Sequence, residues 1–243
     1  MPEPTSAEFD ALAARVQRIE DKLGMSQPTG GLDLTNWYLT LPTGKPGSPD
    51  TVKQPKLATY SSKFFEAVPE GRVCRVWHGG VTTSGSANPR SELRECNPDG
   101  SLAKWSTTKG RHQMVVEGQV NRLTKVKPHV VLLQIHGAED DVTVFRLEGS
   151  KLWITKGDEP HGHLLDDQFT LGKPYRIGFD VRDGVISYSY NGAQVPFTLK
   201  VKDSGSYFKT GAYLQSNPKT APDESTSEYA EVLLRSVRVT HTT

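Results

Sequence analysis

Apolar and polar residues alternate in short stretches over most of this chain. The segment 172–199 shows the pattern most clearly, with alternate apolar positions at Ile177, Phe179 and Val181 and again at Ile186, Tyr188 and Tyr190. Asp183-Gly184 and Asn191-Gly192 interrupt it with residue pairs that suit tight two-residue hairpin turns. The pattern therefore predicts antiparallel strands joined by short turns.

Similar alternation predicts further strands, near 36–41, 72–79, 112–120, 130–136, 143–148, 206–215 and 229–240. Many short strands without helices between them are typical of two antiparallel sheets packed face to face. We therefore predict an all-β domain over 32–243. The pattern leaves open whether these sheets form a plain β-sandwich or a jelly roll.

The first part of the chain has a different period. Apolar residues recur there at spacings of three and four, at Phe9, Leu12, Val16, Ile19 and Leu23. This spacing predicts a short helix over 5–24, followed by a linker at 26–31. Two heptads are few for a coiled coil, so two interpretations stay open. The segment is either a docked helix or frayed tail, or a small element for homo-oligomerisation or attachment.

Composition narrows the classes of function. The chain has 243 residues and a formal net charge of +1, so no overall field favours nucleic acid or an anionic membrane as partner. No apolar run approaches the roughly 20 residues that span a bilayer, and the first residues lack the features of a secretory signal. Cys74 and Cys96 are candidates for a disulfide between neighbouring strands, but two cysteines do not define a compartment.

Three of the predicted strands carry an unusual polar face. Residues two apart on a strand share a face, which groups Arg90 with Glu92 and Arg94, Gln134 with His136, and Tyr207 with Lys209, Tyr213 and Gln215. The opposite faces of these strands are apolar or small. A solvated sheet face is normally richer in Thr, Ser, Glu and Lys. Gly211, in the third strand, leaves space for a ligand or a close backbone approach.

If the three strands are neighbours, their polar faces form one cationic and aromatic surface. Arg binds a carboxylate through two hydrogen bonds, Gln donates to an oxygen that gains charge, and His and Tyr transfer protons. Neutralising the carboxylate of a uronate sugar eases removal of the adjacent C5 proton, because the intermediate that forms is anionic. These residue types therefore predict cleavage of a uronate polysaccharide by β-elimination, with no metal and no cofactor.

The segments RSELRE, QIH and YFKTGAYLQ closely resemble the three signature motifs of polysaccharide lyase family 7, the alginate lyases. The likeness extends over about 32–243 and includes LDLTNWYLTLPTG near its start and LLRSVRVTH near its end. The resemblance implies a β-jelly roll, a concanavalin A-like sandwich of two antiparallel sheets with a long concave groove. Thr210 stands where the family usually has Ala, but it falls on the core side of its strand, so little effect on the chemistry is expected.

The resemblance also implies roles for individual residues. Arg90 and Gln134 would neutralise the uronate carboxylate with help from His136, and Tyr213 would protonate the leaving oxygen. Either Tyr213 or His136 would take the C5 proton, depending on the sugar epimer. The residues expected to bind substrate or orient the catalytic groups are Glu92, Arg94, Tyr207, Lys209 and Gln215.

The expected partner is an anionic polysaccharide, most directly alginate, with glucuronan or another polyuronate still open. Such a substrate implies an extracellular enzyme, although no signal peptide is expected in this chain. Ile135 in the QIH motif is associated in the family with guluronate-containing blocks, which is a weak guide to the substrate.

The sequence fits other functions less well. A jelly-roll glycoside hydrolase needs two carboxylates that flank the bond, and no E-x-D-x-x-E segment is present. A non-catalytic binding module would not need Gln134, His136 and Tyr213 together. His161 and His163 are interpreted as a loop feature rather than metal ligands. The acidic run 139–141 is interpreted as a solvated turn, with contact at the groove edge or a calcium site as minor alternatives.

Overall fold

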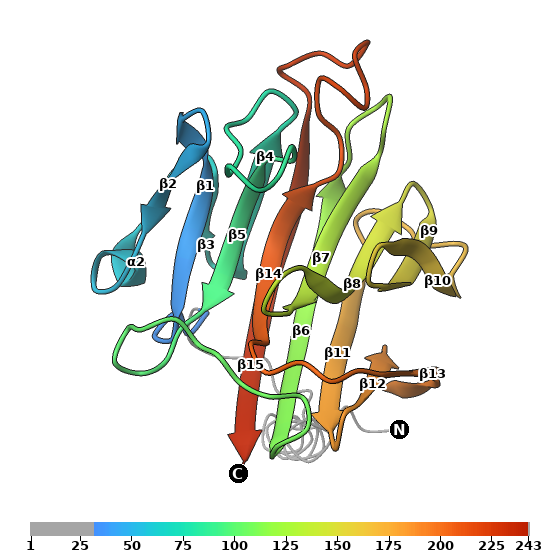
Figure 1. Cartoon of the computed structure of the whole chain (residues 1–243). Coiled ribbons are helices and arrows are strands. Elements are labelled where there is room, and N and C mark those ends of the chain that lie inside the picture. The colour runs from blue at the N-terminus through green and yellow to red at the C-terminus, as the bar shows by residue number, and fades with distance from the viewer. Residues whose placement is uncertain (1–31, 243) are drawn as a thin grey trace, which may run out of the picture. The chain divides into compact units, whose positions relative to one another are not determined.

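Two antiparallel sheets packed face to face make up the part of the chain that the computed structural model describes, residues 32–242 (Figure 1). The helix predicted over 5–24 and the linker at 26–31 lie outside these residues. The described part contains one short helix, α2 (Lys56–Thr59). It contains no helix with the length and apolar character needed to cross a membrane.

The front sheet has eight strands in the order β10-β9-β8-β7-β14-β5-β1-β2. In chain order these are β1 (Trp37–Lys45), β2 (Ser48–Val52), β5 (Arg90–Glu95), β7 (His129–His136), β8 (Asp141–Glu148), β9 (Lys151–Lys156), β10 (Glu159–Asp166) and β14 (Tyr207–Leu214). Every neighbouring pair is antiparallel. The three strands with the unusual polar faces, β7, β14 and β5, lie side by side at the centre of this sheet (Figure 1).

The back sheet has seven strands in the order β13-β12-β11-β6-β15-β4-β3. They are β3 (Phe65–Val68), β4 (Gly71–Trp77), β6 (Arg111–Arg122), β11 (Pro174–Arg182), β12 (Val185–Tyr190), β13 (Ala193–Lys200) and β15 (Tyr229–Thr242). Asp183 and Asn191 have positive φ angles of 52° and 48°, as the predicted hairpin turns require. The all-β sandwich predicted from the alternation is confirmed.

The hydrophobic core fills the space between the sheets. Phe145 of the front sheet packs on Phe179 of the back sheet with ring centroids 5.0 Å apart, and Phe208 stacks on Phe179 at 6.4 Å. The Tyr188 hydroxyl donates to the Thr143 hydroxyl across the same space, at 3.1 Å. Burial of each large side chain contributes about 2 kcal/mol, so the apolar half of each alternating strand fixes which face the polar half presents.

One interpretation of local structure was wrong, and one question that the sequence left open is answered. His161 and His163 lie in β10 and not in a loop. This strand is at the edge of the front sheet and is largely exposed, so its sequence carries no clear alternation. Cys74 and Cys96 are both free, because Cys74 lies on β4 of the back sheet and Cys96 follows β5 of the front sheet.

Glu95 links the two sheets at the end of β5. It is buried, with 4% exposure. Its Oε2 accepts hydrogen bonds from the Trp105 indole at 3.1 Å and from the Phe208 amide at 2.8 Å, and its Oε1 lies 2.5 Å from Nε2 of His241. The Nδ1 atoms of His241 and His112 are 2.7 Å apart. This chain of contacts joins the last residues of β15 to the strands that carry the polar faces.

The buried His112 makes the stability of the domain sensitive to acid. Burial lowers the pKa of His112 from its ordinary value of about 6.5, so in mildly acidic solution the folded state binds fewer protons than the unfolded state. We expect the free energy of unfolding to fall between about pH 7.5 and about pH 5.5, measured by urea denaturation. Burial lowers the pKa of His78 and His129 in the same direction, which adds to the fall.

The variant His112→Gln separates the contribution of His112 from the others. It is expected to be less stable at neutral pH and to lose less stability on acidification than the unchanged protein. An equal loss in both proteins would show that His112 does not cause the acid sensitivity.

Candidate active site

Cross-strand pairing brings the predicted site residues into rows on the outer face of the front sheet. The rows are Gln134–Lys209–Arg94, His136–Tyr207 and Tyr213–Arg90, with Glu92 opposite Gly211. We call these residues together the floor. The adjacency of the three strands, which the sequence could only suggest, is therefore confirmed.

Gly211 allows β14 to fit between its neighbours. Its φ is +143°, and a Cβ at this position would lie 2.5 Å from the Ser91 carbonyl oxygen of β5. The register of β14 against β7 also shifts between Thr210 and Tyr213, as at a β-bulge. The close backbone approach anticipated for Gly211 is present. Thr210 faces the core as predicted, and its hydroxyl donates to the Leu132 carbonyl at 2.9 Å.

Glu92 lies at the centre of the floor and contacts three of the other members. The Lys209 ammonium is 2.7 Å from Oε2, Nη1 of Arg90 is 3.4 Å from the same oxygen, and the Gln134 amide nitrogen donates to Oε1. Glu92 is only 2% exposed. A buried carboxylate needs such donors, because burial of an unpaired charge costs several kcal/mol. From this position, Glu92 can orient the side chains of Lys209, Arg90 and Gln134.

Lys209 is also almost fully buried, with 6% exposure. Burial lowers its pKa, while the nearby Glu92 carboxylate acts in the opposite direction and Arg90 adds to the lowering. The Lys209–Glu92 ion pair thus holds β14 and β5 in register at the level of the site.

Two arginines of β5 lie over tyrosine rings of β14. The guanidinium carbon of Arg90 is 3.9 Å from the Tyr213 ring centroid, and that of Arg94 is 3.8 Å from the Tyr207 centroid. Burial raises the pKa of Tyr207 to about 12, so Tyr207 is protonated at neutral pH and unsuited to act as a base. The Tyr213 hydroxyl is 2.9 Å from the Ser86 hydroxyl, in the loop before β5.

Some polar atoms of the floor lack hydrogen-bond partners among the described residues. They are Nε of Arg90, Nε of Arg94 and Oε1 of Gln134, and all are buried. Unpaired buried donors are costly, and the anionic oxygens of a ligand would satisfy the two guanidinium nitrogens. Gln134 has no exposed surface in this structure, so it is less accessible to a ligand than Arg90.

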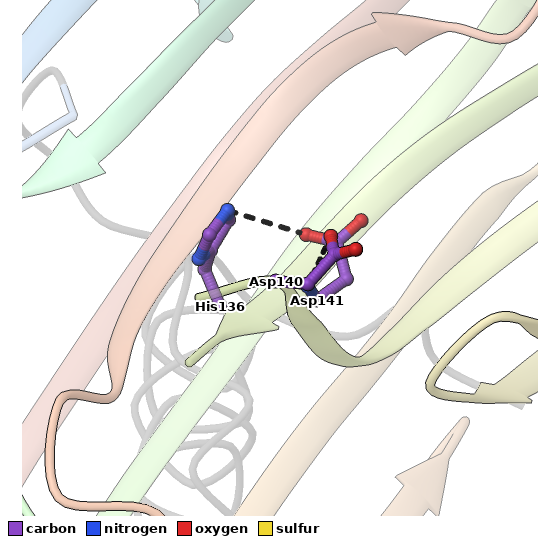
Figure 2. Close-up of side chains that lie close together, drawn as sticks. All are labelled: His136, Asp140 and Asp141. Carbon is purple, nitrogen blue, oxygen red and sulfur yellow. Dashed lines mark hydrogen bonds and ion pairs between the residues drawn. The ribbon is translucent and has the colours of Figure 1, made fainter. Parts of the chain in front are cut away.

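His136 ends β7 with one ring nitrogen fixed by the backbone. Its Nδ1 lies 2.8 Å from the Gly137 carbonyl oxygen, which can only accept, so Nδ1 carries a hydrogen. The ring stacks on Tyr207 with centroids 4.9 Å apart and planes 12° apart. Figure 2 shows the Nε2 edge of the ring turned towards Asp141, whose Oδ1 is 3.8 Å from Nε2.

The acidic run 139–141 is only partly a solvated turn. Glu139 and Asp140 are exposed, whereas Asp141 is the first residue of β8 and faces His136. Ligand atoms of His136, Asp140 and Asp141 lie within 4.8 Å of one another. Three such groups on an open turn do not by themselves define a metal site, and we assign none. The described contacts of His161 and His163 are with Glu148, Trp153 and Phe197.

Several residues near the floor were not singled out from the sequence. Arg146 of β8 donates to the Gln215 side chain at 3.2 Å, which places Gln215 in a neighbouring polar group. The alternation of 143–148 contains the signal for Arg146, since it shares a face with Val144 and Glu148. Ser86 lies in a loop, where no alternation of apolar and polar residues could have indicated its position. An open pocket of about 640 Å³ lies beside it, lined by the segments 82–87 and 217–219.

The fold and the floor define a jelly-roll protein equipped to bind acidic sugar polymers, and comparison with known proteins identifies the family. The family model described as alginate lyase matches residues 32–241. The chain therefore belongs to this family, polysaccharide lyase family 7, and is a polysaccharide lyase, as its three motifs had indicated. Membership in an enzyme family decides against the non-catalytic binding module.

Solved structures show the same fold. An alginate lyase from Corynebacterium sp. is 45% identical with a TM-score of 0.83, over 87% of this chain and 96% of that chain. The alginate lyase AlgAT5, from polysaccharide lyase family 7, is 40% identical with a TM-score of 0.81, over 87% and 97%. The family-7 alginate lyase A1-II′ is 25% identical with a TM-score of 0.73, over 87% and 97%. The comparison with curated proteins gave no match.

The central position of Glu92 predicts a large effect of its replacement. Glu92→Gln keeps the side-chain size but removes the charge that faces Lys209. Loss of one partner of a buried ion pair costs about 3 kcal/mol, so the free energy of unfolding should fall by about this amount in urea denaturation. Lyase activity should fall as well, because Gln134, Arg90 and Lys209 lose the carboxylate that they all contact.

Glu159→Gln is the matched control, since Glu159 makes an exposed ion pair with Lys156 at 3.9 Å. The same chemical change there should alter the free energy of unfolding by less than about 0.5 kcal/mol. Similar effects of the two replacements would contradict the anchoring role of Glu92.

Proposed function

We propose that the chain cleaves alginate by β-elimination on the floor, without a metal ion. The observation that carries this proposal is the position of Arg90, His136 and Tyr213 on three adjacent strands of the front sheet, with Arg90 paired to the buried Glu92. The alginate lyases that are 45% and 40% identical support alginate as the polymer. Alginate is a large anionic polymer, and a substrate of this kind implies an extracellular site of action.

Recognition begins with the uronate carboxylate. We assign this contact to Arg90, because its Nε has no hydrogen-bond partner among residues 32–242 and its guanidinium packs on Tyr213. Its charge is only partly balanced by Glu92, which is shared with Lys209. Gln134 reaches the carboxylate only if the side chains that bury it move. Charge neutralisation of the carboxylate makes the C5 proton more acidic, since the electrons left behind spread onto its oxygens.

We assign the proton transfers to two side chains. Tyr213 presents a hydroxyl beside Arg90, and His136 presents Nε2 because its Nδ1–H is held by the Gly137 carbonyl. We assign protonation of the leaving glycosidic oxygen to Tyr213. His136 takes the C5 proton of one epimer, and Tyr213 takes it in the other, where the proton points to the opposite face of the sugar.

The floor is in the middle of the front sheet, which supports endo action. Arg94 lies on the β5 side of β14 and Arg146 on the β8 side, so cationic groups flank the centre in both directions. A polymer that crosses the sheet can place carboxylates near both groups. Cleavage then occurs within the chain and releases oligosaccharides.

The proposal predicts unsaturated products. Mixed with polymannuronate, polyguluronate or glucuronan, the protein should produce the ultraviolet absorbance of a 4,5-unsaturated uronate with at least one alginate polymer, in the presence of a chelator. Tyr213→Phe and His136→Ala should each lower kcat by about a hundredfold or more, because general acid–base groups contribute about that factor.

The matched controls are Tyr229→Phe and His163→Ala, whose parent residues stack on Trp77 and Phe197 outside the floor. These variants should keep activity close to that of the unchanged protein, and circular dichroism should show all four folded. No absorbance with any polymer would refute the lyase assignment. Activity retained in both Tyr213→Phe and His136→Ala would refute the roles given to those residues.

A further inference from the structure

The environment of His136 leaves one ring nitrogen for chemistry. Nδ1–H donates to the Gly137 carbonyl at 2.8 Å, and one face of the ring is covered by Tyr207. The neutral ring therefore carries its lone pair at Nε2. The group that this nitrogen faces is the carboxylate of Asp141, at 3.8 Å (Figure 2).

A local irregularity in β8 places Asp141 there. Ile135 pairs with Thr143, but His136 pairs with Asp141, so β8 has one extra residue, Val142. Thr143 faces the core, where its hydroxyl accepts from Tyr188, and in a regular strand Asp141 would face the core with it. The extra residue turns Asp141 to the outer face instead. Bulges of this kind often re-aim a side chain beside an active site.

The groups around Asp141 act on its pKa in both directions. Burial raises the pKa of Asp141, while the nearby Lys209 and His136 act against that rise and Glu92 and Asp140 add to it. Asp203 accepts a hydrogen bond from the Ala138 amide at 3.0 Å, and the charge of His136 is one of the influences that lower the pKa of Asp203. At 3.8 Å the His136–Asp141 contact is too long for a hydrogen bond, but it is an effective ion pair when Nε2 is protonated.

We propose that Asp141 is a positioning residue that stabilises the proton taken up by His136 at Nε2 during elimination. The inference rests on the proposed function. The C5–H bond breaks as the Nε2–H bond forms, its electron pair becomes the C4–C5 double bond, and the C4–O bond breaks as Tyr213 protonates the leaving oxygen. Asp141 touches no reacting atom. It lowers the free energy of the imidazolium formed in this step.

The first test needs no substrate. The titration of the His136 ring is followed by NMR with a chelator present, and its signal is identified by its loss in His136→Ala. In Asp141→Asn the midpoint should move to lower pH by about one unit, the size expected for one charge at this distance. Asp140→Asn is the matched control, because Asp140 is exposed and an asparagine can still accept the Asp141 amide hydrogen. Its shift should be clearly smaller.

The second test uses alginate. Asp141→Asn should lower kcat with little change in KM, and the acid limb of its pH–rate profile should move to lower pH with the NMR midpoint. Asp141→Ser should repeat both effects. An unchanged His136 midpoint, or a shift no larger than that of Asp140→Asn, would overturn the inference. So would an NMR shift that leaves the acid limb in place. If the unchanged protein cleaves no polymer, the proposed function fails, and the NMR result still stands as a separate measurement.

Discussion

The carboxylate of Glu92 is the contact on which the rest of the site depends. It is buried at the centre of the front sheet and holds Lys209 of β14, Gln134 of β7 and Arg90 of its own strand. Without it, the nearly buried cations Lys209 and Arg90 would lack a counter-charge, at a cost of several kcal/mol. One acidic residue thus allows a dense cationic surface to exist before any anionic substrate arrives.

The surrounding fold protects this arrangement. Gly211 lets β14 approach β5 closely. Glu95, the last residue of β5, connects β5 and β14 to the end of β15 through the Phe208 amide and His241. The core side chains of the same strands, such as Phe208, fix their polar partners on the outer face. The site residues therefore gain their positions from strands that are held on both faces, which is the preorganisation that electrostatic catalysis requires.

Much of this could be predicted from the sequence, because a strand has a strict two-residue period. The period placed Arg90, His136 and Tyr213 on polar faces, and the motifs indicated that these faces belong together. It could not show how deeply Glu92 and Gln134 are buried, since burial depends on cross-strand neighbours. Asp141 was interpreted as part of a solvated turn because the extra residue in β8 breaks the period. The strand β10 was not predicted because an exposed edge strand does not alternate.

The central claim is that the floor breaks the glycosidic bond by elimination, with the carboxylate neutralised and no water added. Digestion of alginate in water enriched in the heavy isotope of oxygen, followed by mass spectrometry of the fragments, tests this directly. The account predicts that cleavage adds no oxygen atom from the solvent water and yields an unsaturated end lighter by one water than a hydrolysis product. Heavy oxygen incorporated at the new ends, with saturated products, would contradict it.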